Sequence, residues 1–268
     1  MVKKIFAKGY IFLILALMYA PILLLSLYSF TNTTTLGTWN GFSLTLYKKL
    51  FQNKELMTAV GNTLLLAFTS SICATVLGTL GAIGIFYCKQ RTQKVINTVS
   101  QIPVVNAEVV TAISLALLFV FLFGRGNLNF FTLLLGHMVI STPFVVLSVT
   151  PKLKQLDPNL YEAALDLGAT PRRALFQVVL PEILPGVFSG FLLAVTLSLD
   201  DYIVTQFTKP STFQTLSTYI YDHTKKALPN EIRALCALIF VIMLIVVIVL
   251  NIRASRVQKR RAAEHRHK

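Results

Sequence analysis

Three acidic side chains lie inside strongly apolar stretches of this chain, where ionisable groups are costly and are therefore candidates for function. They are Glu108 and the adjacent Asp200 and Asp201. None of the apolar stretches contains a Lys or Arg that would offset these charges. Carboxylates without basic partners attract cations and repel anions. The sequence therefore predicts a path for a cation, and it argues against phosphate, sulfate or molybdate as the solute.

Other polar groups surround the two aspartates. On a continuous helix, Ser198, Asp201 and Thr205 share one face because they are spaced i, i+3 and i+7. Tyr202 adds an aromatic face suited to cation–π attraction. Two alternatives stay open. The aspartate pair can cap a broken helix or contact a partner protein, and Glu108, in the first turn of a helix, can simply complement the helix dipole.

Six stretches are long and apolar enough to carry these side chains across a membrane. The 268 residues are 54% hydrophobic and 13% charged, with a mean hydropathy of +0.67, whereas a soluble domain has roughly 25% charged residues. A span needs about 20 apolar residues and must satisfy its own backbone hydrogen bonds, so we expect helices. The sequence thus predicts an all-α membrane protein with six transmembrane helices. The expected spans are 9–30, 60–87, 104–123, 132–150, 186–207 and 234–252.

The Lys and Arg residues predict the orientation of these spans. With the N-terminus inside, the inner segments hold 17 of them and the outer segments hold 8, which places both termini and the loop at 151–185 in the cytoplasm. The first span has an apolar run longer than that of a signal peptide, so we expect a retained anchor. The net charge of +14 is explained by this bias and by a basic tail at 253–268 that contacts lipid headgroups, and we expect no nucleic-acid partner.

Catalytic and metal-binding signals are weak in this sequence. The three cysteines, at positions 73, 88 and 236, lie in or beside apolar runs without CxxC spacing, which favours a packing role. No nucleophile–base pair is evident, and His137 and His223 have no ligand partners in the sequence. The chain also lacks a GxxxxGK[ST] phosphate-binding loop. We therefore expect a non-enzyme that binds no metal or cofactor of its own.

The segment 157–181, between the fourth and fifth spans, carries helix start and stop signals. Asp157-Pro158 is typical of an N-cap followed by the first helical position. Gly168 is typical of the residue just after a helix end. Thr170-Pro171 repeats the start signal, and Pro181 and Pro185 are expected to end the second helix. The segment therefore predicts two short helices with a sharp turn between them.

This segment also resembles a known motif. Glu162-Ala163-Ala164, three residues, Gly168, nine residues and then Val178-Val179-Leu180-Pro181 resemble the EAA loop of the permease subunits of bacterial ABC importers, with Val178 in place of Ile. The resemblance implies a type I permease fold and docking of an ATP-binding subunit dimer, which would hold ATP and Mg. The coupling residues that it implies are Glu162, Ala163, Ala164, Gly168, Leu180 and Pro181. An interfacial helix pair that only links two spans is the alternative.

A closer resemblance covers most of residues 60–252. The stretch Thr196-Leu197-Ser198-Leu199-Asp200-Asp201-Tyr202, with Ile113-Ser114-Leu115 and the segment 229–234, resembles the second permease subunit of bacterial spermidine/putrescine importers. This implies a bacterial inner-membrane protein that passes a polyamine by alternating access. It also implies a different second permease and an extracytoplasmic solute-binding protein as partners. Asp200, Asp201 and Glu108 would guide the polycation, and Trp39 would contact substrate or binding protein, unless it is an interfacial anchor.

The domain division and the alternatives follow from these expectations. We expect a first helix and outer loop at 1–58, a permease core at 59–252 and a basic cytoplasmic tail at 253–268. The same machine could carry another cationic or organic solute. A protein of a different class, an ion-coupled carrier that uses the aspartate pair as a cation site, would need no ATPase, although no internal repeat supports it.

Overall fold

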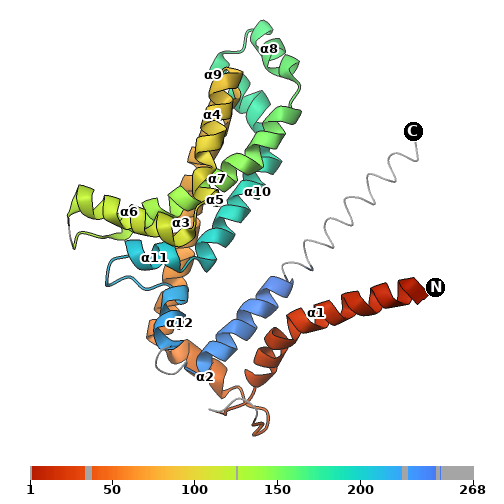
Figure 1. Ribbon diagram of the computed structural model, residues 1–268, viewed down its shortest axis with the longest axis vertical. Helices are drawn as coiled ribbons and strands as arrows, with labels where there is room; N and C mark the ends of the chain where they lie inside the picture. The colour runs from red at the N-terminus through yellow and green to blue at the C-terminus, as the bar shows by residue number, and fades with distance from the viewer. Residues whose placement is uncertain (1, 34–37, 125, 225–228, 246–247, 249–268) are drawn as a thin grey trace. The chain divides into compact units, whose positions relative to one another are not determined.

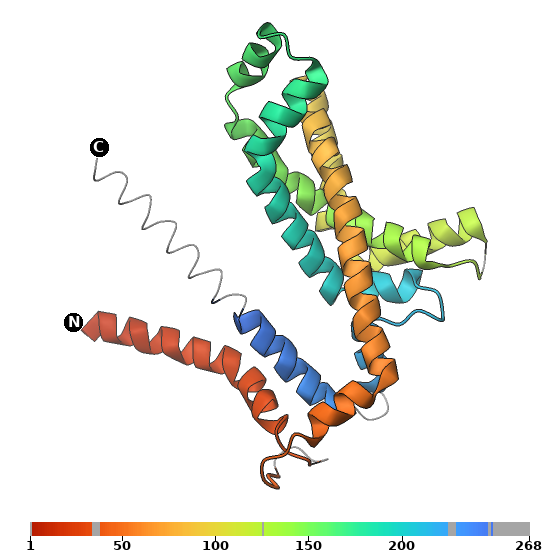
Figure 2. The ribbon, with the colours of Figure 1, turned by 180° about the vertical axis from the view of Figure 1, so that it is seen from behind.

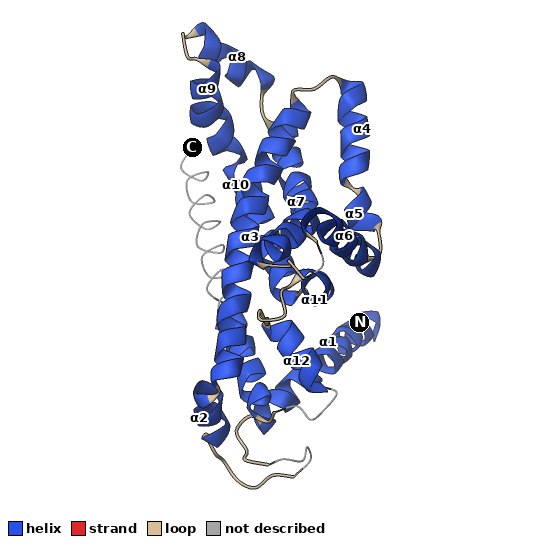
Figure 3. Cartoon of the chain, turned by 90° about the vertical axis from the view of Figure 1, so that its left-hand side faces the viewer, coloured by secondary structure: helices blue, strands red, loops and turns tan. Residues whose placement is uncertain are grey.

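The computed structural model describes residues 2–33, 38–124, 126–224, 229–245 and 248. All regular structure in these ranges is helical, as Figure 3 shows, which confirms the all-α prediction. The chain divides into two compact units, Met1–Met57 with His223–Lys268, and Thr58–Asp222, which we call the terminal unit and the central unit. The basic tail at 253–268 and the end of the expected sixth span lie outside the described residues.

Four helices in the described part of the chain are long and apolar enough to span a membrane. They are Gly9–Tyr28 within α1 (Val2–Tyr28), α3 (Lys54–Phe86), α7 (Phe130–Gln155) and the continuous segment Pro171–Asp200. A fifth span is formed if Gln90–Val105 and Glu108–Phe123 count together, although they are bent by 103°. Of the expected sixth span, the structure describes a helix at 231–245 and residue 248.

The core of the central unit lies where α3, α7 and α10 (Leu180–Asp200) pack side by side (Figures 1 and 2). These helices are apolar almost all round, so each can bury one side and leave the other for lipid or a partner. Tyr161 and Leu175, from the segment after α7, pack against the same cluster. The buried members are Ala82, Ile83, Val145, Val146, Val149, Leu153, Val179, Ile183 and Ala194.

Glycines allow these helices to approach closely. A Cβ atom added at Gly78 on α3 would lie 2.7 Å from the Cβ of Val145 on α7. A Cβ at Gly190 on α10 would lie 3.1 Å from the Cα of the same valine, and one at Gly186 would lie 3.0 Å from the carbonyl oxygen of Ser148. In membranes the lipid is as apolar as the side chains, so the hydrophobic effect does not drive helices together. Close van der Waals packing at small residues is then a main source of helix association. Val145 therefore sits at the point where the three helices meet.

We expect Gly78→Ala to destabilise the central unit. Overpacking a tight contact costs about 1–3 kcal/mol, which exceeds the gain of roughly 0.5–1 kcal/mol from replacing a helical glycine by alanine. The matched control is Gly81→Ala on the same helix, because no atom lies within 4 Å of a Cβ built there. Thermal unfolding of the detergent-solubilised protein should show a lower Tm for Gly78→Ala alone. Equal Tm values for the two variants would contradict the close crossing.

The end of the segment 157–181 differs from the prediction. Pro181 and Pro185 do not end the second helix, because α9 (Pro171–Ala174) continues through the π-helical segment η1 (Leu175–Val179) into α10. Proline has no N–H and clashes with the carbonyl four residues earlier. In η1 the N–H of Leu180 donates to the carbonyl of Leu175, five residues back, so the hydrogen-bond ladder changes register immediately before Pro181. The prolines are accommodated rather than helix-ending.

The bent third span also differs from the prediction of one helix at 104–123. The short helix α5 (Ile102–Val105) ends at Asn106, which is extended, and α6 (Glu108–Phe123) starts after Ala107. Asparagine favours such positions because its side chain competes for nearby hydrogen bonds, and here the Asn106 amide donates to Thr111 Oγ1 at 3.2 Å. Glu108 is thereby the first residue of α6, in the favourable position at a helix start.

The terminal unit holds α1, α2 (Thr45–Gln52) and the helix at 231–245. Polar contacts join segments that are distant in sequence: the Asn53 amide donates to Glu231 Oε1 at 3.0 Å, and the Arg233 guanidinium donates to the carbonyl of Thr33 at 3.0 Å. Trp39 belongs to this unit, is 54% exposed and lies edge-on to Tyr28. Its expected role with substrate or binding protein stays a prediction.

Candidate functional site

The apolar segment expected as a continuous fifth span breaks at the aspartate pair. The helix α10 ends at Asp200, Asp201 is extended, and a six-residue helix, α11 (Ile203–Thr208), follows. Asp201 Oδ1 accepts the N–H of Val204 at 3.2 Å, and Oδ2 accepts the N–H of Thr205 at 2.7 Å. A carboxylate that binds free N–H groups in this way caps a helix start. The alternative in which an aspartate caps a broken helix is therefore the arrangement found for Asp201.

The break corrects the prediction of one polar face on a continuous helix, but the three residues of that face still lie close together. Ser198, Asp201 and Thr205 do not lie along one helix; instead all three surround His137 of α7. The ring Nδ1 lies 2.8 Å from Ser198 Oγ, and Nε2 lies 2.9 Å from Thr205 Oγ1 and 3.4 Å from Asp201 Oδ2. Ser198 Oγ is also 3.0 Å from Ser70 Oγ on α3. These side chains are buried, so they form a packed polar cluster rather than an open wall.

His137 is the residue that sequence reasoning missed. Its partners lie 61 and 68 positions further along the chain, so no local spacing reveals them. The usable signal is a single ionisable side chain in an apolar stretch, which a buried helix retains only with hydrogen-bond partners.

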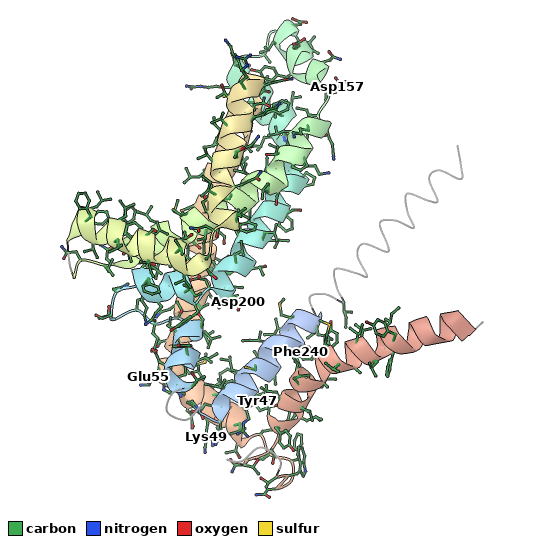
Figure 4. The ribbon with its side chains drawn as sticks, in the orientation of Figure 1. Tyr47, Lys49, Glu55, Asp157, Asp200 and Phe240 are labelled. Atoms are coloured by element: carbon green, nitrogen blue, oxygen red, sulfur yellow. The ribbon has the colours of Figure 1, made fainter. Side chains whose placement is uncertain are left out.

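The structure brings the three acidic residues of the apolar stretches to one place. Glu108, at the start of α6, is near enough to both aspartates for their charges to interact. Asp200 and Glu108 are exposed, whereas Asp201 is only 5% exposed. Figure 4 shows Asp200 at the end of α10. Two accessible carboxyls and one buried carboxyl therefore share a small region of high negative charge density.

An aromatic pair lies next to this region. Tyr202, directly after the break, stacks against Tyr221 of α12 (Leu216–Thr224) with ring centroids 4.3 Å apart and planes tilted by 34°. Ser217 of the same helix donates to the carbonyl of Asp201 at 2.7 Å. The start of α12 is thus tied to the break, and it holds an aromatic surface beside the carboxyls.

The segment 157–181 forms the predicted helix starts. Asp157 caps α8 (Pro158–Asp166) by accepting the N–H of Asn159 at 3.0 Å, and Thr170 caps α9 by accepting the N–H of Arg173 at 3.4 Å. Between them Gly168 has φ +83°, a conformation that side chains with a Cβ rarely adopt. The turn between α8 and α9 therefore depends on glycine.

One tyrosine anchors α8, and most other residues of this helix are exposed. Tyr161 packs on the core cluster and on Tyr87, with ring centroids 5.5 Å apart. Glu162 and Ala163 are exposed, and Leu167 is 89% exposed. The helix presents a small polar and apolar surface outward.

The exposed surface of α8 and the carboxyl cluster lie at opposite ends of the α7–α10 helix pair. Figure 4 labels Asp157 and Asp200 at the two ends of the α7–α10 pair. The 21 residues of α10 correspond to about 30 Å at about 1.5 Å per residue. Leu180 and Pro181 begin α10, so any displacement of α8 and α9 acts at the end of α10 remote from Asp200.

Residues 74–263 match the family described as binding-protein-dependent transport system inner membrane component. The chain belongs to this family. It is therefore an inner-membrane transport component rather than an enzyme, as expected from the EAA-like segment.

Curated relatives within this family are similar over most of their length. The spermidine/putrescine transport system permease protein PotC of Escherichia coli K12 is 32% identical over 248 residues, or 92% of this chain and 93% of PotC. The putrescine transport system permease protein PotI of the same strain is 35% identical over 230 residues, or 83% of this chain and 81% of PotI. PotC of Haemophilus influenzae is 32% identical over 241 residues. The predicted resemblance to polyamine permeases is confirmed.

A solved structure shares the fold of this inner-membrane transport component. It is the crystal structure of a bacterial ABC transporter involved in the import of the acidic polysaccharide alginate, with a TM-score of 0.70, 13% identity and coverage of 94% of this chain and 95% of that one. That transporter imports an acidic polymer, so the fold itself does not determine the sign of the solute. The solute must be argued from the site.

Proposed function

We propose that this chain is a permease subunit of an ATP-driven importer and that it passes polyamines, spermidine or putrescine, by alternating access. The observation that carries the proposal is the gathering of Glu108, Asp200 and Asp201 at the break of the fifth span, in a chain 32–35% identical to PotC and PotI. Polyamines are flexible cations with spaced ammonium groups. Carboxyls on two different helices suit a solute with several spaced ammonium groups better than they suit a small ion with a single charge.

The roles of the site residues follow from their exposure. Asp200 and Glu108 are accessible, so they contact ammonium groups through charge-assisted hydrogen bonds. Tyr202 and Tyr221 add a surface for the methylene chain and for cation–π contact. Asp201, Ser198 and Thr205 are buried, and they hold the geometry of the break. The apolar stretches 104–123, 132–150 and 186–207 contain no Lys or Arg that would repel a cation.

The energy of ATP hydrolysis acts on the permease at the end of α10 that is remote from Asp200. The exposed residues Glu162, Ala163 and Gly168, with the half-buried Ala164 between them, fit a cleft of an ATP-binding subunit dimer on the cytoplasmic side, where the Lys and Arg bias predicts this segment. Closure of that dimer on ATP and Mg displaces α8 and α9, and α10 transmits the movement because it continues α9 without a stop. A second permease, different from this chain, supplies the other half of the path, and an extracytoplasmic binding protein delivers the solute.

Uptake in cells lacking their own polyamine importers tests the proposal. Cells that express this chain with its neighbouring transport genes should accumulate labelled spermidine or putrescine, and deletion of the ATPase gene should abolish the uptake. Affinity purification of the tagged permease should retain the ATPase. Uptake that survives deletion of the ATPase and collapses with an ionophore would favour the ion-coupled carrier. Uptake of another solute, with polyamines neither taken up nor competing, would contradict the polyamine cargo.

A further inference from the structure

The hydrogen bonds around His137 can be satisfied in one consistent direction. Asp201 ends the chain of groups as a carboxylate, which only accepts, so the hydroxyl of Thr205 donates to its Oδ2 at 2.7 Å. Thr205 Oγ1 then accepts from His137 Nε2–H at 2.9 Å. The neutral ring has one donor, so Nδ1 accepts from Ser198 at 2.8 Å. Ser198 Oγ accepts in turn from Ser70 at 3.0 Å.

This directed chain joins four helices across the break of the fifth span. Ser70 lies on α3, Ser198 on α10, His137 on α7, and Thr205 on α11. His137 is the only one of these groups that contacts residues on both sides of the break directly while belonging to neither side. Hydrogen bonds that share one direction polarise each other, and in a buried site an unmade bond is costly.

The two hydrogen bonds of the His137 imidazole, to Ser198 and to Thr205, contribute differently to helix packing. The helix α10 packs on α7 through Val145 and its own glycines, so loss of the Ser198 link leaves it in place. The helix α11 has only six residues, of which Val204 packs against α6 and against Gly136 of α7. Its hydrogen bonds to α7 are the His137–Thr205 bond and the bond from Thr132 Oγ1 to the carbonyl of Thr208 at 3.1 Å. The donor at Nε2 therefore matters more for the position of α11 than the acceptor at Nδ1.

We propose that His137 is a positioning residue for transport. It fixes α11 against α7 so that Asp201 remains the cap of α11 and Asp200 stays beside Glu108. It contacts no solute itself because it is fully buried. The inference rests on the proposed polyamine function and adds to it a residue that holds the solute-binding carboxyls in register.

Three substitutions of His137 separate positioning from mere stability. His137→Gln keeps a donor near the position of Nε2, His137→Asn keeps an acceptor near Nδ1, and His137→Phe keeps neither. The matched control is Ser141→Ala on the same helix, because Ser141 is buried and its hydroxyl has no hydrogen-bond partner among the described residues. The readouts are uptake of labelled spermidine and putrescine per permease in the membrane, and ATP hydrolysed per polyamine transported in proteoliposomes of the whole complex.

The expected order distinguishes the outcomes. His137→Phe and His137→Asn should lower uptake per permease about tenfold and raise the ATP cost per polyamine, an effect that corresponds to one lost buried hydrogen bond. Uptake by His137→Gln should stay within about threefold of wild-type uptake. Uptake by Ser141→Ala should equal that of the wild type. If His137→Phe does not reach the membrane, the comparison of Gln with Asn decides. Equal uptake per permease for these two variants would overturn the inference.

Failure of the inference can be told from failure of the proposed function. If the wild-type complex takes up no polyamine, or if Asp200→Asn changes nothing, the proposed function is wrong. If the wild type transports polyamines and Asp200→Asn impairs uptake, while all three His137 variants behave as Ser141→Ala, only the positioning role is wrong.

Discussion

Replacement of the two accessible carboxyls should remove most polyamine uptake. Asp200→Asn and Glu108→Gln should each lower uptake about tenfold or more, because a hydrogen bond to a charged group contributes about 1.5–3 kcal/mol and about 1.4 kcal/mol is a factor of ten. The double variant should lose more than either single one, since the side chains lie on different helices and face one region. Initial rates of labelled putrescine and spermidine uptake, divided by the amount of permease in the membrane, measure the effect.

The control for this experiment is an acidic residue outside the cluster. Glu55 is exposed near the start of α3, in the terminal unit, and Glu55→Gln should change uptake by less than about twofold. The amides preserve shape and polar character, so a folding defect would appear as a lower amount of permease rather than a lower rate per permease. Normal uptake by the double variant would refute the role of the carboxyls in binding the cation.

Substitution of the turn glycine between α8 and α9 should uncouple the permease from ATP. Gly168 has φ +83° with open space around its Cα, so Gly168→Val is opposed by backbone strain alone, at about 1–3 kcal/mol. The chain relieves that strain by changing the angle between α8 and α9. We expect uptake to fall about tenfold or more and the co-purified ATPase to decrease, while the amount of permease in the membrane stays near that of the wild type.

A second glycine provides a matched control for this substitution. Gly126, between α6 and α7, has φ +89° and also has open space where a Cβ would lie. Gly126→Val therefore imposes the same type of strain at a different turn of the central unit, for which the Lys and Arg bias predicts an outer position. It should leave both ATPase retention and uptake largely intact. Equal loss of uptake in the two variants would mean that turn strain in general, and not the segment 157–181 in particular, limits transport.

Local signals in the sequence were sufficient to predict the helix starts and the turn of the segment 157–181. Asp157, Gly168 and Thr170 act through their immediate neighbours, so their positions predict helix starts and a left-handed turn correctly. Pro181 was misread because proline is a strong helix-ending signal, and the π-helical segment before it depends on packing along α10 that no local pattern encodes. Apolar run length alone predicted the all-α class.

The carboxyl cluster was only partly predictable. The intramembrane position of Glu108, Asp200 and Asp201 marked them as candidates, but their proximity depends on how α6 and α11 pack. An aspartate is also a common helix-capping residue, yet in an apolar run Asp201 fits a continuous helix equally well. His137 required contacts over more than 60 positions, which a single sequence does not provide.

The break after Asp200 has an electrostatic consequence that no side-chain substitution can remove. The last four carbonyls of an α-helix have no partner within the helix, and together they carry about half of a negative elementary charge. Because α10 ends at Asp200, this backbone charge lies at the same place as the acidic side chains and is fixed by the peptide units. Even a permease stripped of its carboxyls should therefore keep a weak preference for cations over neutral or anionic solutes. The acidic side chains add to a negative charge that the C-terminus of α10 already provides.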